Sequence, residues 1–267
     1  MCESQIQWRD SGLQDKDGIL VASDEQQEWL LPWWWERYVE KNSAPVAFVD
    51  LGMSKEKKAW CESKGEVIAL SVPENFFSAE KVDKKNGQSW ELSYGPAIWK
   101  ARKSWFMKPL ALLQTPYRRT IWLDLDCEVL GSVEKLFDSC NHPSKVAFVR
   151  EYGWDGVSAE QEEVIYNSGV VIYERGAELI YQWAEMALSE NQRFLGDQQL
   201  LSYIIFSQKW EVQELPYIYN WRIAQGASPE AVVVHWVGSW GKNYIKQFGG
   251  IKPLFNPKVA IGSSKEM

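Results

Sequence analysis

Apolar and amphipathic segments alternate over the first seventy residues, and this order constrains the fold more than any other feature of the chain. Residues 18–23, 45–50 and 66–70 are short apolar runs, whereas residues 25–42 and 54–64 have the spacing of helices. A β-α-β-α-β order produces a parallel sheet with helices on its faces. Such sheets bind ligands at the carboxyl ends of their strands. We therefore expect an α/β protein whose site lies at that edge.

A further apolar run leads directly into two acidic residues, Asp124 and Asp126. Alternate residues of an extended chain point the same way, so these two carboxylates converge. Their mutual repulsion is removed by a divalent cation, and oxygen ligands suit Mg²⁺ or Mn²⁺. A cation at a strand end is well placed to hold a diphosphate, which predicts an enzyme with a nucleotide-activated substrate. The alternative is a strand end whose exposed acids cap a turn.

The sequence contains one other Asp-x-Asp pair, Asp15 and Asp17, with which this motif can be compared. This pair lies in a polar segment with no apolar run leading into it, and we interpret it as a solvated turn. Beyond these motifs, residues 72–97 are expected to form a long irregular loop. The remaining predicted elements are helices over 98–114, 177–189 and 198–208, and strands over 145–150, 169–173 and 231–236.

Composition excludes several classes of protein. The net charge of −7, without a stripe rich in Lys and Arg, argues against binding to nucleic acid. No apolar run approaches the length of a membrane span, and the polar N-terminus lacks the apolar core of a signal peptide. The four cysteines are scattered, with no Cys-x-x-Cys pair, so we expect a cytoplasmic protein without disulfides or a zinc site.

Tryptophan is unusually abundant, with 16 residues in 267. Indole faces stack on sugars and bases, but most of these residues are expected in the core. The run Trp33-Trp34-Trp35 is predicted, in order of preference, to pack in the core, to form a dimer interface, or to make a peripheral contact with a membrane surface.

Four more segments place polar groups at the ends of predicted elements. They are Ala22-Ser23-Asp24, Asn167-Ser168-Gly169, Asp197-Gln198, and the segment from His235 through Gly238 to Lys242.

With the acidic pair, these segments resemble the GT-A glycosyltransferases, particularly the retaining group that includes glycogenin and the bacterial lipopolysaccharide galactosyltransferases. Residues 105–126 are also similar to the mannosyltransferase-like branches. The resemblance covers about residues 18–242 and implies a GT-A (Rossmann-like) α/β fold, with a mixed, mainly parallel sheet flanked by helices. We expect one domain over 1–267, with a nucleotide-binding half at about 18–130 and an acceptor-side half at about 131–245.

The resemblance also implies a function and roles for individual residues. A sugar would pass from a nucleotide-diphosphate sugar, most commonly a UDP-hexose, to a glycan, lipid or protein acceptor, with Mn²⁺ or Mg²⁺ as cofactor. The implied metal ligands are Asp124, Asp126 and His235, and the implied catalytic pair is Asp197 and Gln198. The implied donor-binding residues are Ala22, Ser23, Asp24, Lys108, Asp124, Leu125, Asp126, Asn167, Ser168, Gly238 and Lys242; Trp154 and Asp155 are assigned to the acceptor side.

Structural interpretations remain open for some of these residues. His235 could be a buried structural histidine, Lys108 a solvated helix charge, and Asp197 a helix cap. Lys242 departs from the family pattern, because it stands seven residues after His235 rather than six and is followed by Asn-Tyr rather than Pro-Trp.

The Asp197-Gln198 pair favours a retaining reaction, since the leaving phosphate can then accept the acceptor's proton. An inverting reaction would need a carboxylate base, for which Asp155 and Glu151 are candidates. Two other functions stay open: a nucleotidyltransferase that makes the nucleotide sugar, and a non-catalytic carbohydrate-binding protein. The first normally has a Gly-rich loop after the first strand, where this chain has Ala22-Ser23-Asp24.

Overall fold

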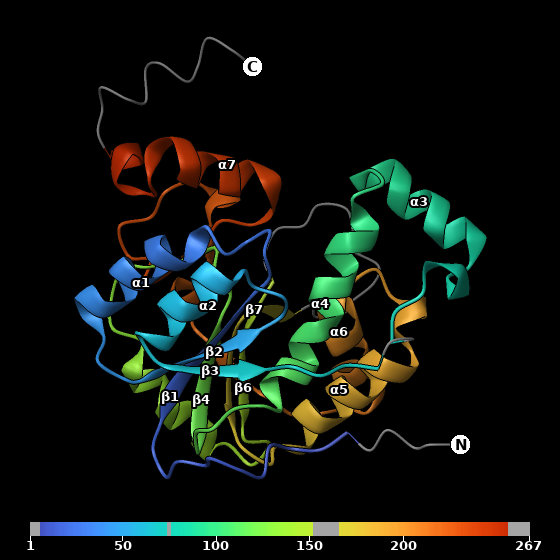
Figure 1. The fold of residues 1–267 in the computed structure, drawn as a ribbon, viewed down its shortest axis with the longest axis horizontal. Coiled ribbons are helices and arrows are strands. Elements are labelled where there is room, and N and C mark those ends of the chain that lie inside the picture. The colour runs from blue at the N-terminus through green and yellow to red at the C-terminus, as the bar shows by residue number, and fades with distance from the viewer. Residues whose placement is uncertain (1–5, 74–75, 152–165, 256–267) are drawn as a thin grey trace.

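A seven-stranded sheet forms the centre of the molecule. The computed structural model describes residues 6–73, 76–151 and 166–255. The strands lie in the order β3-β2-β1-β4-β7-β6-β8 (Figure 1). Their bounds are β1 Gly18–Ser23, β2 Val46–Asp50, β3 Glu66–Ala69, β4 Arg119–Leu123, β6 Val146–Arg150, β7 Tyr166–Glu174 and β8 Gln213–Leu215.

The sheet is mixed but mainly parallel. β1 pairs in parallel with β2 and β4, β2 with β3, and β6 with β8, whereas β7 runs antiparallel to both β4 and β6. The predicted fold class is therefore confirmed. Because β4 and β7 are antiparallel, the end of β4 meets the beginning of β7 at one edge of the sheet.

Helices cover both faces of the sheet (Figure 1). Alternate residues of β1 enter two separate cores: Ile19 and Val21 pack with residues of α1 and α2, and Leu20 packs with residues of α4, α5 and α6. This alternation is expected for a strand that is buried on both sides. The helices are α1 Leu30–Lys41, α2 Lys55–Glu62, α4 Ile98–Leu112, α5 Glu178–Ser189 and α6 Asp197–Ser207.

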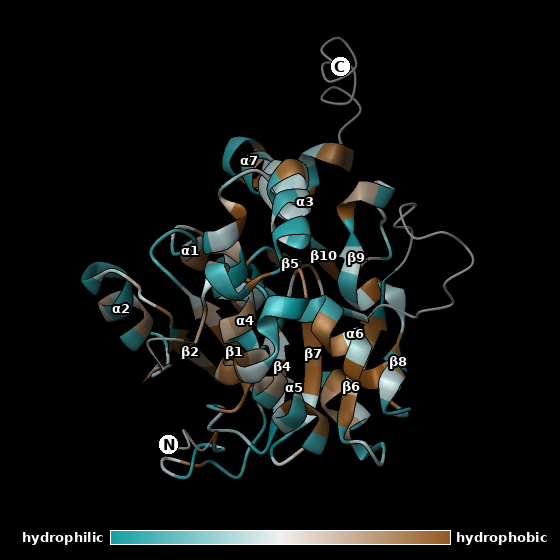
Figure 2. Cartoon of the chain, turned by 90° about the vertical axis from the view of Figure 1, so that its right-hand side faces the viewer, coloured by the Kyte–Doolittle hydropathy of each residue, from teal (hydrophilic) through white to brown (hydrophobic). Residues whose placement is uncertain are grey.

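A small second sheet stands beyond the carboxyl end of β4. It contains β5 Cys127–Val129, β10 Val233–His235 and β9 Trp221–Arg222, in the order β5-β10-β9. Helix α7, Gly238–Phe248, follows β10 directly. Figure 2 shows these elements together above the ends of β4 and β7. Short 3-10 turns complete the described chain: η1 Ala79–Lys81, η2 Glu134–Asn141, η3 Asn191–Arg193, η4 Tyr217–Asn220, η5 Ile223–Gln225 and η6 Lys252–Phe255.

The prediction of an irregular loop over 72–97 was wrong. Helix α3, Lys84–Tyr94, occupies this region. Its sequence lacks an apolar stripe, and its only buried residue is Gly87. The helix begins at a cap, because the Asp83 carboxylate accepts hydrogen bonds from the backbone N–H groups of Lys85 and Asn86.

One other predicted segment differs from the structure. The helix expected over 25–42 begins only at Leu30, because the Asp24 carboxylate accepts the N–H groups of Gln26 and Gln27 and holds a turn in front of it. The segment from Gly238 to Lys242, which follows His235, lies in the first turns of α7. Its Gly238 has a φ of 81°, which favours glycine.

The tryptophan run packs mainly in the core, as predicted. Trp34 is fully buried, while Trp33 and Trp35 are half-buried against the same core. Across the described ranges, helices are too short or too polar to cross a bilayer. Cys61, Cys127 and Cys140 are free thiols. The comparison pair is less solvated than expected, since Asp17 forms a 2.6 Å ion pair with Arg119.

Candidate functional site

Two carboxylates and one imidazole converge where β4 ends. Asp124 and Asp126 follow β4, and the antiparallel pairing of β10 with β5 sets His235 opposite Cys127. The His235 Nε2 atom lies 3.4 Å from Asp126 Oδ1 and 3.9 Å from Asp124 Oδ2. His235 and Asp126 are buried, whereas Asp124 is half-buried. The two carboxylates therefore meet through the turn between β4 and β5, not through alternation along an extended strand as predicted, and the pairing of β10 with β5 adds the imidazole.

Two lysines neutralise these carboxylates. Lys108 of α4 lies 2.9 Å from the Asp124 carboxylate and also donates to the Ser168 hydroxyl at 3.1 Å. Lys242 of α7 forms an ion pair with Asp126. Lys108 is buried, so it is not a solvated helix charge. The extra residue between His235 and Lys242 is accommodated within the first turns of α7.

The pKa shifts follow from burial and from these pairs. Burial alone would raise the pKa of Asp126, but Lys242 and His235 outweigh it and hold that pKa well below its usual range. Burial alone would lower the pKa of Lys108, but Asp124 and Asp197 raise it. The pKa of Lys242 is raised in the same way by Asp126, against the effect of burial. All three groups are therefore charged at neutral pH.

A buried acid, Asp197, completes the inner edge of the site. Burial raises the pKa of the Asp197 carboxyl, and Lys108, 3.5 Å away, opposes that shift. Asp197 accepts a 2.8 Å hydrogen bond from the Ser168 hydroxyl. Gly196 is the N-cap of α6 and Asp197 is its first residue, and the Asp197 carboxylate contacts Ser168 and Lys108, so a cap alone does not describe it.

The imidazole of His235 is oriented by a chain of amides. Its Nδ1 lies 2.9 Å from Asn220 Oδ1, and the Asn220 amide donates to Asn167 Oδ1 at 2.7 Å. Asn220 thus presents its oxygen to His235, so Nδ1 donates a hydrogen bond to it and Nε2 is the ring nitrogen that faces Asp126. Sequence reasoning missed Asn220, because it lies in a short 3-10 turn and matches no motif.

Gly169 makes room for this imidazole. A Cβ atom at this position would lie 2.2 Å from His235 Cε1. The backbone of Gly169 also joins the two strand ends, because its carbonyl accepts the N–H of Asp124 at 2.9 Å. Any larger residue at position 169 would therefore displace the histidine.

Glu151, at the end of β6, holds the amides on the other side of the site. Its carboxylate accepts hydrogen bonds from Asn167 at 2.7 Å and from Gln198 at 3.0 Å, and it forms an ion pair with Arg222. These three partners leave Glu151 poorly placed to act as the general base that an inverting reaction would require. Trp154 and Asp155, assigned to the acceptor side, lie outside the described residues.

The remaining predicted donor-binding residues contribute in different ways. Ser23 ends β1 and is buried, next to half-buried Ala22. The carboxylate of Asp24 accepts a 2.9 Å hydrogen bond from Ser104 of α4. The side chain of Leu125 is buried in the core, so this residue can offer a ligand only its backbone. Gly238 is exposed at the beginning of α7.

The donor set fits a divalent cation. Ligand atoms of Asp126, Cys127 and His235 lie within 4.8 Å of one another, and Asp124 is adjacent. Two carboxylates and an imidazole suit Mn²⁺ or Mg²⁺. Sequence reasoning did not propose Cys127, although it directly follows Asp126. Its thiol donates to the Gly169 carbonyl, and burial raises its pKa well above the usual range, which favours a neutral thiol over a thiolate ligand.

Comparisons with family models and with curated proteins find no match to this chain. Solved structures do match. The galactosyltransferase LgtC, in complex with donor and acceptor sugar analogues, superposes with a TM-score of 0.56 at 15% identity, covering 84% of this chain and 87% of LgtC. The chain has the GT-A glycosyltransferase fold.

Two other structures share this GT-A fold. The glycosyltransferase GlyE of Streptococcus pneumoniae TIGR4 gives a TM-score of 0.55 at 16% identity over 85% of this chain. This chain spans 55% of the length of GlyE. Mouse xyloside xylosyltransferase 1 gives a TM-score of 0.51 at 15% identity, over 83% of this chain and 97% of the mouse protein.

Proposed function

We propose that this chain is a metal-dependent glycosyltransferase. It would move a sugar from a nucleotide-diphosphate sugar, a UDP-hexose in the first instance, to a glycan, lipid or protein acceptor. The observation that carries this proposal is the cluster of Asp124, Asp126 and His235, flanked by Lys108 and Lys242, at the carboxyl edge of the sheet. The GT-A fold supports it, since the similar structures are those of a galactosyltransferase and a xylosyltransferase.

Asp124, Asp126 and His235 would hold Mn²⁺ or Mg²⁺. The bound cation would supply Lewis-acid stabilisation of the negative charge on the diphosphate. The chain's own contribution is to fix the ligands: Asn220 sets the tautomer of His235, and Trp122 donates a 2.7 Å hydrogen bond to Asp124.

Lys242 would stabilise the leaving group. When the glycosidic C–O bond breaks, negative charge grows on the departing diphosphate and positive charge grows on the sugar. Lys242 reaches Asp126 from the first turns of α7, so a small movement of its side chain would bring the ammonium to a phosphate bound beside that carboxylate. Gly238, exposed at the same helix end, would let the phosphate approach the backbone.

Asp197 and Gln198 would face the sugar. A buried carboxylate stabilises positive charge on the ring more strongly than an exposed one. The Gln198 amide is held in one orientation, because it donates to Glu151 while its Oε1 lies 3.4 Å from the N–H of Ser168. We propose retention of configuration, with the departing phosphate accepting the acceptor's proton. The engagement of Glu151 by Arg222 supports this over inversion.

The proposal is tested by calorimetric titration with UDP and GDP, each with and without Mn²⁺. We expect UDP to bind in the presence of Mn²⁺ and at least tenfold more weakly without it. In the double variant Asp124→Asn, Asp126→Asn, this difference should disappear. The change in UDP affinity on adding Mn²⁺ is compared, rather than the affinity itself, because the variant leaves Lys108 and Lys242 free to bind phosphate without metal.

The variant Asp15→Asn serves as the control, since it removes an exposed carboxylate far from the cluster in the sequence. Hydrolysis of UDP-hexose above background would then separate an enzyme from a carbohydrate-binding protein. Failure of UDP, GDP, CDP and dTDP to bind under either condition would rule out the proposed function.

A further inference from the structure

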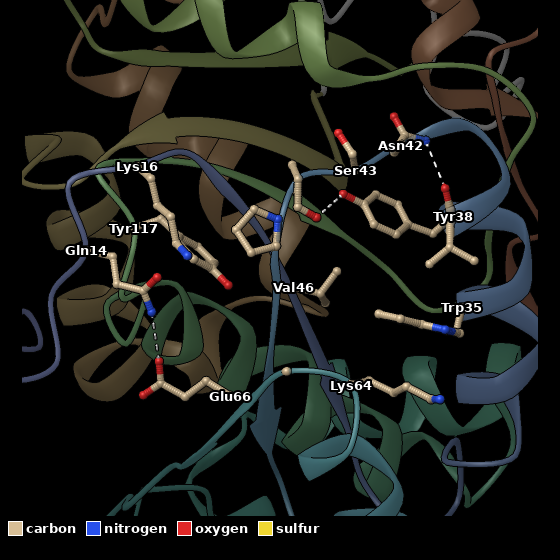
Figure 3. A pocket seen from close by; sticks show the side chains of 14 residues that line it. Gln14, Lys16, Trp35, Tyr38, Asn42, Ser43, Val46, Lys64, Glu66 and Tyr117 are labelled. Atoms are coloured by element: carbon tan, nitrogen blue, oxygen red, sulfur yellow. Dashed lines mark hydrogen bonds between the residues drawn. The ribbon is translucent and has the colours of Figure 1, made fainter.

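A cavity of about 460 Å³ lies at the opposite end of the strands from the candidate site. Its walls come from α1, from the residues before β2, and from the turn between α2 and β3, with Tyr117 at its base (Figure 3). Val46 and Glu66, which line it, are the first residues of β2 and β3, whereas Asp124 follows the end of β4. The volume falls within the range of about 300–1,000 Å³ that is typical of ligand sites.

Positive charge is in excess around this cavity. Lys16 and Lys64 line it, and neither lies within ion-pair distance of a carboxylate in the described part of the chain. Glu66 is the one acidic residue in the lining, and it is already neutralised by Arg9 at 2.5 Å. Two exposed lysines that line one cavity, without a carboxylate partner among the described residues, favour an anionic ligand in a protein whose net charge is −7.

The same cavity presents an aromatic face and a hydrogen-bond donor. Trp35 is half-buried, and its indole N–H has no partner among the described residues. The Lys64 ammonium lies 6.0 Å from the centre of the Trp35 ring, so cation and ring face are adjacent. This combination suits a pyranose with an acidic substituent, since its C–H face can stack on an aromatic ring while its charge pairs with a cation.

Tyr117 adds a fixed polar group at the base of the cavity. Its ring is almost completely buried, at 1% exposure, yet no described residue accepts from or donates to its hydroxyl. Figure 3 shows the Tyr117 side chain pointing toward Val46 and Glu66 across the open space. Burial raises the pKa of Tyr117, so the hydroxyl stays protonated. The hydroxyl oxygen is not among the fully buried side-chain atoms that lack a partner, so it reaches the space of the cavity and can bond to water or to a ligand there.

We propose that this cavity is a second, non-catalytic binding site for a saccharide with an anionic group. The sugar ring stacks on Trp35, the anionic group pairs with Lys64 and Lys16, and a sugar hydroxyl bonds to Tyr117. The site requires neither nucleotide nor metal, and it is therefore independent of the proposed transfer reaction.

Ligand-observed NMR titration with three small probes tests this site. The probes are methyl β-D-glucuronide, glucose 6-phosphate and methyl β-D-glucoside. We expect at least one anionic probe to bind in the millimolar range and the neutral glucoside to bind at least tenfold more weakly. Comparison of the first two probes shows whether a carboxylate or a phosphate is preferred. Equal binding of the neutral probe, or no binding of either anionic probe, would overturn the proposal.

Variants locate the bound sugar. Lys64→Ala and Tyr117→Phe should each weaken anionic binding at least threefold, whereas Lys57→Ala, a charge removal on α2 outside the cavity lining, should not. Binding must also persist in the double variant Asp124→Asn, Asp126→Asn. If binding is lost there, or unchanged in Lys64→Ala and Tyr117→Phe, the sugar lies elsewhere and the assignment fails. UDP binding with Mn²⁺ should remain unaltered in Lys64→Ala, so this test and that of the proposed function fail separately.

Discussion

At the scale of single residues, Gly169 links the geometry of the sheet to that of the candidate metal site. Its missing side chain admits His235, and its carbonyl accepts the N–H of Asp124. The His235 ring, the acidic pair and the beginning of β7 therefore occupy fixed positions relative to one another. A change here should affect both stability and metal binding.

We predict that Gly169→Ala lowers the free energy of unfolding by about 2 kcal/mol, because an inserted methyl group in a packed interior typically costs about 1–3 kcal/mol. It should also weaken Mn²⁺ binding at least tenfold, since His235 must move. Urea unfolding and metal titration measure the two effects. The control is Gly87→Ala in α3, where the new Cβ would lie 3.5 Å from Trp99, an ordinary van der Waals distance. Unchanged Mn²⁺ affinity in Gly169→Ala would argue against His235 as a ligand.

The sequence predicted some of these residues and could not predict others. Asp124, Asp126 and His235 were identifiable because each follows or ends an apolar run and has a short-range pattern. Asn220 and Arg222 were not, because their roles arise from contacts with His235 and Glu151, which are distant in the sequence. Long-range side-chain pairing of this kind leaves no periodic signal in a single chain.

At the scale of elements, α3 was the main error, and Arg102 gives part of the reason. This buried residue of α4 donates hydrogen bonds of 2.8 Å to the carbonyls of Leu195, Asn191 and Phe194. Its guanidinium lies 4.3 Å from the ring centre of Trp90 in α3. Helix α3 is thus stabilised by a cation–π contact with a neighbouring helix rather than by an apolar stripe of its own. Its Asp83 cap and Gly95, with a φ of 75°, were the available signals.

We predict that Arg102→Met destabilises the fold by about 3 kcal/mol, because the carbonyl groups of Leu195 and Phe194 lose the donor that Arg102 gives them, whereas that of Asn191 keeps the N–H of Phe194. Limited proteolysis should cut near α3 earlier than in the unmodified chain, as the contact with Trp90 is lost. The matched control is Lys103→Met, an exposed neighbour on the same helix. Equal destabilisation by the two changes would show that the arginine contacts contribute little.

At the scale of the whole molecule, the central sheet joins segments distant in the sequence. β4 pairs with β7, so a strand from residues 18–130 lies beside one from residues 131–245. Glu134 forms a second connection, because its carboxylate accepts hydrogen bonds from the N–H groups of Ser43 at 2.5 Å and Ala44 at 2.8 Å. The β-α-β pattern predicted the parallel strands, whereas the antiparallel insertion of β7 required knowledge of long-range pairing.

The Glu134 connection gives the stability a defined pH dependence. Hydrogen bonds from Ser43 hold the pKa of Glu134 below its usual range, and Ala44 adds to this effect. A carboxyl whose pKa is lower in the folded state stabilises it above the unfolded pKa of about 4.3, and this stabilisation is lost as the pH falls. We predict that Glu134→Gln costs about 1 kcal/mol at pH 7 and that the difference from the unmodified chain shrinks below about pH 4. Urea unfolding of both proteins at several pH values measures this difference. A difference that stays constant with pH would contradict the role of the Glu134 charge.

The ion pairs of Lys108 and Lys242 also bear on whether this chain needs a bound metal in order to fold. Many small domains that coordinate structural zinc fold only when the metal binds, because the site does not exist in the unfolded chain. Here each carboxylate of the acidic pair already has an ammonium partner from an adjacent helix. Under the proposed function, folding of this chain would therefore not depend on metal supply. The ion would be bound by an already folded protein, and the two lysines that it displaces would lie close to the phosphates of the donor.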